Sequence, residues 1–467
     1  MMILLFNREN KTRQVDVPDF NIVEFGDVIS ENYYSLSYRG EKIGYTSTIK
    51  KNIPRGYLYQ EASFYRLPVG GVVQEITGEG LMAVDDSLRT RNFTFTFSGG
   101  GYETTVNAVV RDSMLLAEVI TPGNSESMQI ELNGPFYTSS IIPEFVAMQD
   151  FKRGSYELPT FDPMSLSSRN YKIIINGKDI IKRFGDRTVY DITIKYGAMR
   201  GKMYVDTSAT LLMETTPEGF MSVKEDKEKA LALDYDNKGS NDLLEDFSIM
   251  MAGEEIEKPR EAIELKIKIE NLTDEFFQLD DFNQRWNPEN KILTIKSDGF
   301  ANDSSTWTDS DTSETFDIQC NDRRIISRAE KITQNSSGQL EKLLAINSYL
   351  FENIDKQYAA SIPSAVDVLR KMEGDCNEHT ILFVALSRSI GIPSRVNVGL
   401  LYMNGMFYYH AWPQAFAEGR WRTFDPTFNQ YPADAAHIKL ISGGLDMMIG
   451  LLRVGDARLE LESVKYE

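Results

Sequence analysis

A long series of short β-type segments constrains the fold of this chain more than any other feature. Between about residue 20 and about residue 235, β-branched and aromatic residues recur in short runs. These runs are separated by turns that contain Gly, Pro, Asn or Asp. Short strands at such spacing predict an antiparallel sandwich or a partly open half-barrel. The runs with the clearest strand pattern are 33–49, 57–66, 72–84, 91–97, 104–110, 171–175, 188–196 and 201–214.

One short repeat lies inside this β-rich region. Residues 82–87 and 203–208 both have the pattern M-x-V-D-x-S, and in both the pattern predicts a strand that runs into a polar turn. A single repeat of this length leaves open whether the region consists of two related halves.

The pattern changes twice further along the chain. Residues 221–260 are rich in charge and indicate a domain border, and a second β segment follows at 262–270 and 291–297. From residue 323 onward, apolar residues recur every three to four positions, which is typical of helices. A chain of 467 residues holds about three domains at about 150 residues each. We therefore expect a β-rich domain at 1–245, a small β segment at 246–320 and an α+β domain at 321–467.

The last of these domains is predicted to be a helix layer on a sheet. A helix at 376–390 is apolar almost all round at 381–386, which indicates that it is buried in the middle of its domain. Strands at 395–402 and 407–416 are joined through Asn404-Gly405, the strongest short hairpin signal. A buried helix packed on an antiparallel sheet is an α+β arrangement. The other predicted elements are helices at 323–332 and 340–354, a short helix that starts after Ser364, and a strand at 420–424.

Composition excludes several classes of protein. The net charge of -19 argues against nucleic acid or an anionic membrane as the main partner. No run of about 18 apolar residues predicts a membrane span. Two distant cysteines do not make a disulfide framework. The opening segment 1–6 is too short for a signal-peptide core, so we expect either a protein that is not exported or a leader outside the numbered chain.

Three residues of the last domain have the types that a thiol nucleophile requires. Cys376 lies in the first turn of the predicted buried helix, where free N–H groups and the helix dipole favour the thiolate. His410 lies on a predicted strand and could accept the thiol proton and later donate it to a leaving group. Asp425 ends the next strand and could orient the imidazole. Cys376, His410 and Asp425 are therefore the candidate catalytic residues.

The remaining cysteine and histidines have simpler interpretations. His379 is a competing base one helical turn from Cys376, but its side chain would point parallel to the thiol, so we expect it to pack within the helix. A metal site of Cys376, His379 and His410 would lack a second cysteine or further clustered ligands. We therefore predict no metal and no cofactor. Cys320 and His437 are expected to be structural residues.

Residues from about 323 to 440 resemble the transglutaminase-like superfamily, which shares a papain-like catalytic core. The resemblance implies Cys376 as nucleophile, His410 as base and Asp425 as orienting group, with an acyl-thioester intermediate. Members include protein-glutamine transferases, peptidases and amidases, so the resemblance gives the mechanism rather than the substrate. It rests on the motifs Gly374-Asp375-Cys376, Gly391-Ile392-Pro393-Ser394-Arg395, Tyr409-His410-Ala411-Trp412 and Asp425-Pro426-Thr427, in the family order Cys, His, Asp.

We therefore expect a thiol acyl-transfer enzyme that acts on an amide bond of a protein or peptide substrate. The alternative is a catalytically silent binding or scaffold protein of the cell envelope. The N-terminal β region loosely resembles half-barrel modules found beside such domains in bacterial envelope proteins, which implies an extracytoplasmic location.

The donors that would stabilise an oxyanion are only partly defined by the sequence. The backbone N–H of Cys376 is one natural donor, because it lies at the start of a helix. Gln357, Tyr358 and Trp412 are candidates for the second donor, and Trp412 is expected to wall the cleft.

Overall fold

The computed structural model describes most of the chain. The opening segment 1–6 and Tyr358, a candidate oxyanion donor, lie outside the described residues. Within the described ranges, no helix is both long and apolar enough to cross a membrane. The described residues are 26–69, 72–99, 102–121, 124–132, 134–162, 167–180, 184, 187–196, 199–216, 219–233, 248–272, 277–301, 303–315, 317–357, 364–443 and 457–467.

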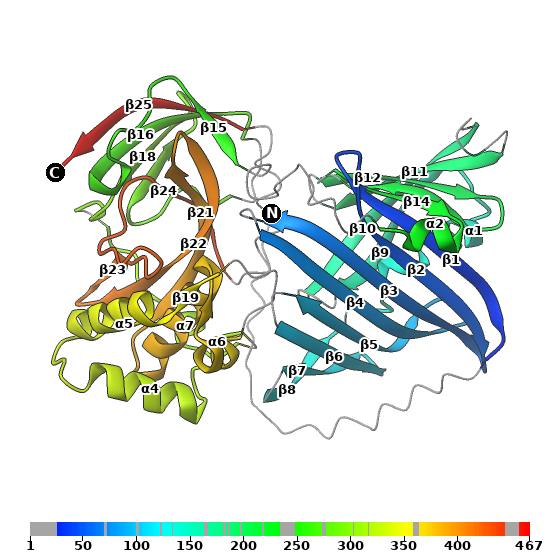
Figure 1. The fold of residues 1–467 in the computed structure, drawn as a ribbon, viewed down its shortest axis with the longest axis horizontal. Helices are drawn as coiled ribbons and strands as arrows, with labels where there is room; N and C mark the ends of the chain where they lie inside the picture. The colour runs from blue at the N-terminus through cyan, green and yellow to red at the C-terminus, as the bar shows by residue number, and fades with distance from the viewer. Residues whose placement is uncertain are drawn as a thin grey trace.

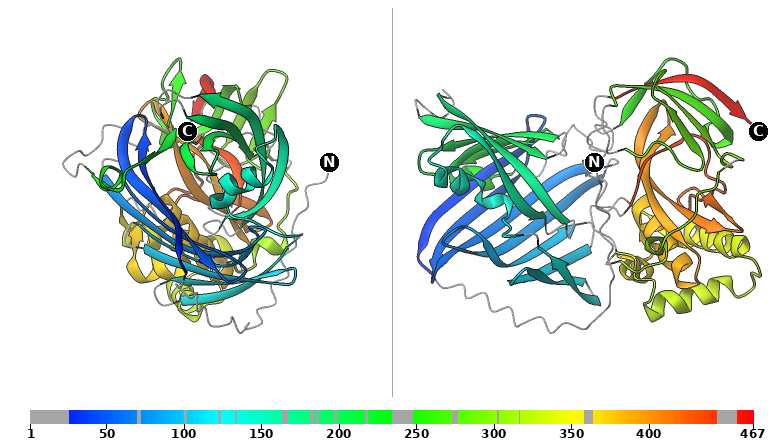
Figure 2. Two further views of the ribbon diagram at one scale, coloured as in Figure 1. Left: turned by 90° about the vertical axis from the view of Figure 1, so that its right-hand side faces the viewer. Right: turned by 180° about the vertical axis from the view of Figure 1, so that it is seen from behind.

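Fourteen strands form one curved antiparallel sheet in the first part of the chain (Figures 1 and 2). The order runs from β8 back to β1, which pairs with β14, and then continues down to β9. One curved sheet with two edges corresponds to the half-barrel, one of the two arrangements that the strand spacing predicts, rather than to the sandwich. The strands are β1 (Val28–Tyr38), β2 (Glu41–Ile53), β3 (Gly56–Val69), β4 (Val72–Asp85), β5 (Thr90–Gly99), β6 (Tyr102–Arg111), β7 (Met114–Thr121), β8 (Asn124–Glu131), β9 (Gly154–Asp162), β10 (Ser167–Ile180), β11 (Thr188–Tyr196), β12 (Met199–Asp206), β13 (Leu211–Thr215) and β14 (Phe220–Glu225).

The two six-residue repeats form the same kind of turn. In each, an aspartate carboxylate accepts N–H bonds from the residues two and four positions further on. Asp85 does so between β4 and β5, and Asp206 does so between β12 and β13. Such side-chain bonds stabilise a local turn, so turn chemistry accounts for the pattern, and the relation between two halves stays a prediction.

One hydrophobic cluster joins strands from both ends of this sheet. Leu115 on β7 and Leu158 on β9 belong to the same buried cluster, together with Val146 of helix α1 (Ile142–Met148). A parallel bridge between Tyr137 and Thr160 also links the segment after β8 to β9. Because burial of apolar surface drives the association, the sheet curls until its two edge regions share a core.

A second sheet, of nine strands, is built from the later part of the described chain. Its order is β17-β18-β16-β25-β15-β22-β21-β24, with β23 paired to β22. Strands from the segment predicted at 246–320 are therefore hydrogen-bonded into the same sheet as the later strands, and the division near residue 320 stays a prediction. The strands are β15 (Ile249–Ala252), β16 (Ala262–Glu270), β17 (Gln284–Asn287), β18 (Ile292–Lys296), β21 (Ser394–Met403), β22 (Met406–Ala417), β23 (Arg420–Thr423), β24 (His437–Ser442) and β25 (Arg458–Tyr466).

Four helices gather beside β21 and β22 (Figure 1). They are α4 (Arg323–Thr333), α5 (Gln339–Asn353), α6 (Ala365–Lys371) and α7 (Cys376–Ser389). Every residue of α7 from Asn377 to Arg388 is buried, and α7 shares one hydrophobic cluster with the other three helices and with β21 and β22. The prediction of a buried helix on an antiparallel sheet is confirmed, and the fold of this part is α+β.

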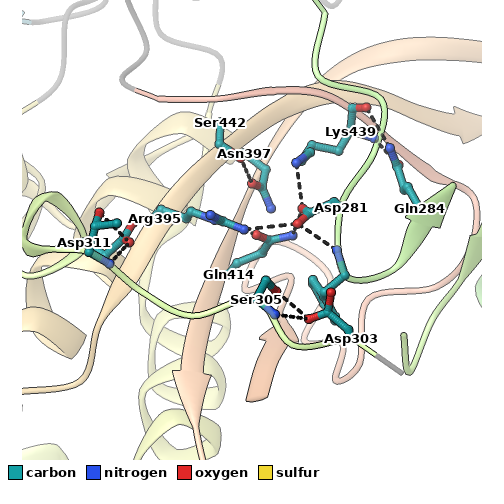
Figure 3. A network of polar contacts seen from close by, with 12 residues as sticks. Asp281, Gln284, Asp303, Ser305, Asp311, Arg395, Asn397, Gln414, Lys439 and Ser442 are labelled. Atoms are coloured by element: carbon teal, nitrogen blue, oxygen red, sulfur yellow. Dashed lines mark hydrogen bonds and ion pairs between the residues drawn. The ribbon is translucent and has the colours of Figure 1, made fainter. Parts of the chain in front are cut away.

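A buried polar network links β21, β22 and β24 from one side (Figure 3). The Asp281 carboxylate accepts hydrogen bonds from Lys439 Nζ at 2.6 Å, Gln414 Nε2 at 2.8 Å and Arg395 Nη2 at 3.1 Å. Burial disfavours a charged Asp281, but Lys439 and Arg395 outweigh it and hold the pKa of this carboxyl below its usual range. A buried charge is tolerated only with such partners, so the network fixes the three strands relative to one another.

Candidate active site

A capping box shapes the start of α7. The Asp375 carboxylate accepts the N–H of Asn377 at 2.8 Å, and the Glu378 carboxylate accepts the N–H of Asp375 at 2.8 Å. The Tyr409 hydroxyl on β22 donates to Asn377 Oδ1 at 2.8 Å and ties the helix start to the sheet. Cys376 is thereby the first residue of the helix, as the sequence predicts, and its side chain is half-buried.

Gly374 allows this helix start. Its φ is 152°, and an added Cβ would lie 2.3 Å from Glu378 Cγ.

We expect Gly374→Ala to lower the free energy of unfolding by about 1–3 kcal/mol, because the Glu378 side chain must leave the capping position. Urea unfolding measures the loss. Gly391→Ala is the matched control, since Gly391 also has a positive φ, of 76°, but open space around its Cβ position. Equal losses in both variants would show that backbone strain, rather than the Glu378 contact, causes the effect.

His410 and Asp425 are in direct contact. His410 Nε2 donates to Asp425 Oδ2 at 2.9 Å, and the side chains are almost completely buried. The other carboxylate oxygen, Oδ1, accepts the backbone N–H groups of Thr427 at 2.8 Å and Phe428 at 3.3 Å. Burial opposes the charge of Asp425, but His410 and His437 outweigh it and hold the pKa of this carboxyl far below its usual range. Asp425 is therefore an ionised carboxylate with all of its acceptor positions in use.

The thiol of Cys376 lies against β22. A backbone hydrogen bond from Ala411, the residue after His410, reaches the sulfur. Burial and then the Asp375 carboxylate raise the pKa of the thiol well above its usual range, and the Ala411 bond opposes them only in part. Burial and the Asp375 carboxylate therefore oppose the thiolate that the helix start is expected to favour.

His379 is a buried part of α7. Its Nδ1 lies 2.6 Å from the main-chain oxygen of Asp375, and burial lowers the pKa of the imidazole to about 4. The ring is therefore neutral at pH 7 and donates its Nδ1–H to its own helix. This placement agrees with the packing role expected from its position one turn after Cys376.

His437 contacts the same carboxylate as His410, which the sequence analysis missed. His437 is the first residue of β24, and its Nε2 lies 3.0 Å from Asp425 Oδ2. Its Nδ1 lies 3.1 Å from both Oδ1 and the main-chain oxygen of Asp434. Only the sequence neighbour Asp434, three residues earlier, and the presence of just three histidines in the chain hinted at a special role.

The cluster of His410, Asp425 and His437 also has the composition of a metal site. Their candidate ligand atoms lie within 4.8 Å of one another. However, both Nε2 atoms point at one oxygen, at 2.9 and 3.0 Å, which are normal hydrogen-bond lengths. Zinc would need the donor atoms at about 2.0–2.2 Å from a common centre. The contacts are therefore hydrogen bonds that a bound metal ion would have to break.

Trp412 supports the two imidazoles from within the core. Its side chain is 1% exposed, its ring is stacked beside His410 at 6.0 Å, and it meets His437 edge-on at 5.1 Å. A residue so completely buried does not wall an open cleft, so that expectation is wrong. The exposed aromatic ring next to His410 is instead Phe428, which is 38% exposed, with its centroid 5.7 Å from the imidazole.

The remaining oxyanion candidate is not directed at the thiol. Gln357 is exposed, and its amide donates to the Asp355 carboxylate at 3.0 Å. The backbone N–H of Gln357 bonds the Gly374 carbonyl at 3.2 Å, so this segment braces the turn before Cys376. The backbone N–H of Ala411 reaches the sulfur, and the backbone N–H of Cys376 belongs to the first residue of the helix.

Three comparisons with known proteins bear on this site. A search of the curated proteins found no match. Solved structures with low similarity include a β-barrel-like protein of a domain of unknown function from Brucella abortus, with 11% identity, 42% of this chain and 94% of that chain covered, and a TM-score of 0.35. A "Putative Cysteine Protease" from Cytophaga hutchinsonii has 17% identity, coverage of 44% and 87%, and a TM-score of 0.27. A "Putative Protease" from Parabacteroides distasonis has 11% identity, coverage of 69% and 64%, and a TM-score of 0.20.

A family model gives the more specific result. The model described as the transglutaminase-like superfamily matches residues 326–426. This range contains most of α4, all of α5 to α7 and β21 to β23, and the three residues Cys376, His410 and Asp425. Residues 326–426 are therefore a transglutaminase-like superfamily domain.

Proposed function

We propose that the chain is a thiol acyl-transfer enzyme in which Cys376 attacks an amide bond of a protein or peptide substrate. The observation that carries the proposal is the hydrogen bond of 2.9 Å between His410 and Asp425. His410 lies on β22, and the backbone N–H of the next residue, Ala411, contacts the Cys376 sulfur. A nucleophile, a base and a group that orients the base are the three components that such chemistry needs.

The protonation of the site determines how the first step proceeds. Because burial and Asp375 favour the protonated form of the Cys376 thiol, its proton leaves while Sγ attacks the carbonyl carbon. His410 Nε2 is occupied by Asp425, so Nδ1 is the nitrogen that accepts this proton. His410 then passes the proton to the amide nitrogen as the C–N bond breaks. The amine leaves, and the acyl group remains on Cys376 as a thioester.

The second step releases the acyl group. Water or a second amine attacks the thioester carbonyl and gives a proton to His410 Nδ1, and the S–C bond breaks as this proton returns to the sulfur. In both steps negative charge develops on the carbonyl oxygen. The N–H of Cys376 is free to stabilise it, because the first N–H groups of a helix lack an intrahelical acceptor.

An activated ester tests the proposal directly. The full chain is mixed with p-nitrophenyl acetate, the release of p-nitrophenolate is followed, and the protein is mapped by mass spectrometry after acid quenching. We expect a burst and one acetyl group on Cys376, with none on Cys320, which is 3% exposed and whose thiol pKa burial raises. Cys320→Ala is the matched control and should keep the burst, whereas Cys376→Ala should lose it.

The same experiment separates the alternatives. A burst that persists in Cys376→Ala, or a Cys376 that takes up no acetyl group in the folded protein, contradicts the proposal and favours a silent binding or scaffold protein. Adding a primary amine such as methylamine then separates transfer from hydrolysis, because a transferase yields N-methylacetamide in place of acetate.

A further inference from the structure

His437 has an acceptor on each ring nitrogen. Its Nε2 faces the Asp425 carboxylate at 3.0 Å, and its Nδ1 faces the carboxylate and main-chain oxygens of Asp434 at 3.1 Å. Carbonyl and ionised carboxylate oxygens only accept hydrogen bonds, and an imidazole donates from both nitrogens only when it is protonated. The hydrogen bonds therefore require His437 to be an imidazolium cation, although its side chain is only 2% exposed.

The charges around His437 are arranged in alternation. Arg260 Nη1 forms an ion pair with Asp434 Oδ2 at 2.9 Å, on the side away from His437. Asp434 contacts His437, His437 contacts Asp425, and Asp425 contacts His410. The ring centroids of His410 and His437 lie 5.6 Å apart. Burial opposes the charge on His437, but Asp434 and Asp425 outweigh it and raise the pKa of the imidazole to about 9. The two cations, Arg260 and His437, thus balance the charges of the two carboxylates, Asp434 and Asp425, in the row of groups that ends at His410.

We propose that His437 is a positioning residue, which holds the same carboxylate oxygen of Asp425 that His410 contacts and neutralises the charge of this carboxylate. Both imidazoles share Asp425 Oδ2, at 2.9 and 3.0 Å. His437 therefore keeps this oxygen in place while His410 gains and loses its proton. This inference rests on the proposed function, because it assigns His410 the role of the base.

The neutralising charge has a consequence for His410. An unbalanced buried carboxylate would stabilise the imidazolium form of His410 strongly, and a base that is already protonated cannot accept the thiol proton. With His437 charged, the pair of Asp425 and His437 has no net charge, so His410 stays available as a base. The α7 side adds the titratable groups Asp375, Cys376, Glu378 and His379, of which His379 is neutral at pH 7.

Histidine NMR tests this arrangement without any need for turnover. The full chain contains only three histidines, so selective ¹⁵N labelling gives three imidazoles, which single His→Gln variants assign. In the unchanged protein we expect the His437 ring to carry both protons up to about pH 9. In His437→Gln, whose amide Nε2 can still donate to Asp425, we expect the pKa of His410 to rise by about 1 or more. The reason is the loss of a cation about 5.6 Å away.

His379→Gln is the matched control. It also places glutamine at a buried histidine position, but it removes a neutral ring, so the titration of His410 should not move. A His437 ring that is neutral at pH 7.5 in the unchanged protein overturns the proposal, even if His437→Gln fails to fold. A folded His437→Gln in which His410 titrates as before also overturns it. If His410 and His437 behave as expected but Cys376 is not acylated, the charge arrangement stands and the proposed function fails.

Discussion

Replacing Asp425 by asparagine is expected to lower the rate of Cys376 acylation by about 10³–10⁴-fold and the free energy of unfolding by about 3–5 kcal/mol. The Asp425 carboxylate accepts two imidazole and two backbone N–H groups. The amide of asparagine offers only one acceptor atom, so some of these four N–H groups are left without a partner. The buried cation His437 also loses one of its two counter-charges. The rate falls because His410 is no longer oriented, and the stability falls because a buried charge is uncompensated.

The burst of p-nitrophenolate and urea unfolding measure the two effects separately. Asp281→Asn is the matched control, because Asp281 is also a buried carboxylate with cationic partners, Lys439 and Arg395. We expect this variant to lose comparable stability while its acylation rate stays close to that of the unchanged protein. Equal rate losses in both variants would show that the effect of Asp425→Asn comes from general loosening of the fold.

The stability of the protein is expected to fall by about 3 kcal/mol as pH rises from 6.5 to 9, through His437 alone. The folded-state pKa of His437, about 9, lies above its ordinary value of 6.5. Its contribution is therefore complete below pH 6.5 and is lost as pH rises through 9. Glu378 acts in the same direction from pH 4.5 upward, because burial and Asp375 raise the pKa of this carboxyl. His379, with a pKa lowered to about 4, instead reduces stability as pH falls below 6.5.

Urea unfolding at a series of pH values checks this profile. In His437→Gln the decline between pH 6.5 and 9 should become shallower by the part that His437 contributes, whereas the part from Glu378 remains. The variant His379→Gln should keep the decline at high pH and lose stability less steeply below pH 6.5. If His437→Gln and the unchanged protein declined in parallel, His437 would not be a buried cation.

Local signals in the sequence were enough to predict much of the fold. The helix at 376–390 appears as Cys376–Ser389, and the hairpin at Asn404-Gly405 joins β21 to β22. Both depend on periodicity and turn chemistry, which neighbouring residues determine. Strand β8 (Asn124–Glu131) escaped prediction because its sequence, NSESMQIE, is polar. It forms a strand because β7 provides the hydrogen-bonding partner, and such context is not contained in a short window.

The candidate site also combines features that the local sequence predicts with features that depend on the tertiary fold. Cys376, His410 and Asp425 have recognisable positions at a helix start, on a strand and at a strand end, so residue types in order made them the candidate residues. His437 contacts Asp425 because β24 pairs with β21. The pairing of these two strands belongs to the tertiary fold, and no sequence motif indicates it. The thiol pKa also depends on tertiary structure, since burial and Asp375 raise it and neither effect is visible in a helix-start motif.

The position of β25 has a consequence for the order of folding. This strand, Arg458–Tyr466, lies between β16 and β15, although β16 precedes it by nearly 200 residues in the chain. Contacts between segments so distant in sequence form slowly, because a long loop must close first. On the ribosome, the strand β22 that carries His410 can pair with β21 early, but the link from β15 to β16 must await the arrival of residues 458–466. Until then β16 has an unpaired edge, on which a chaperone or a second nascent chain could act.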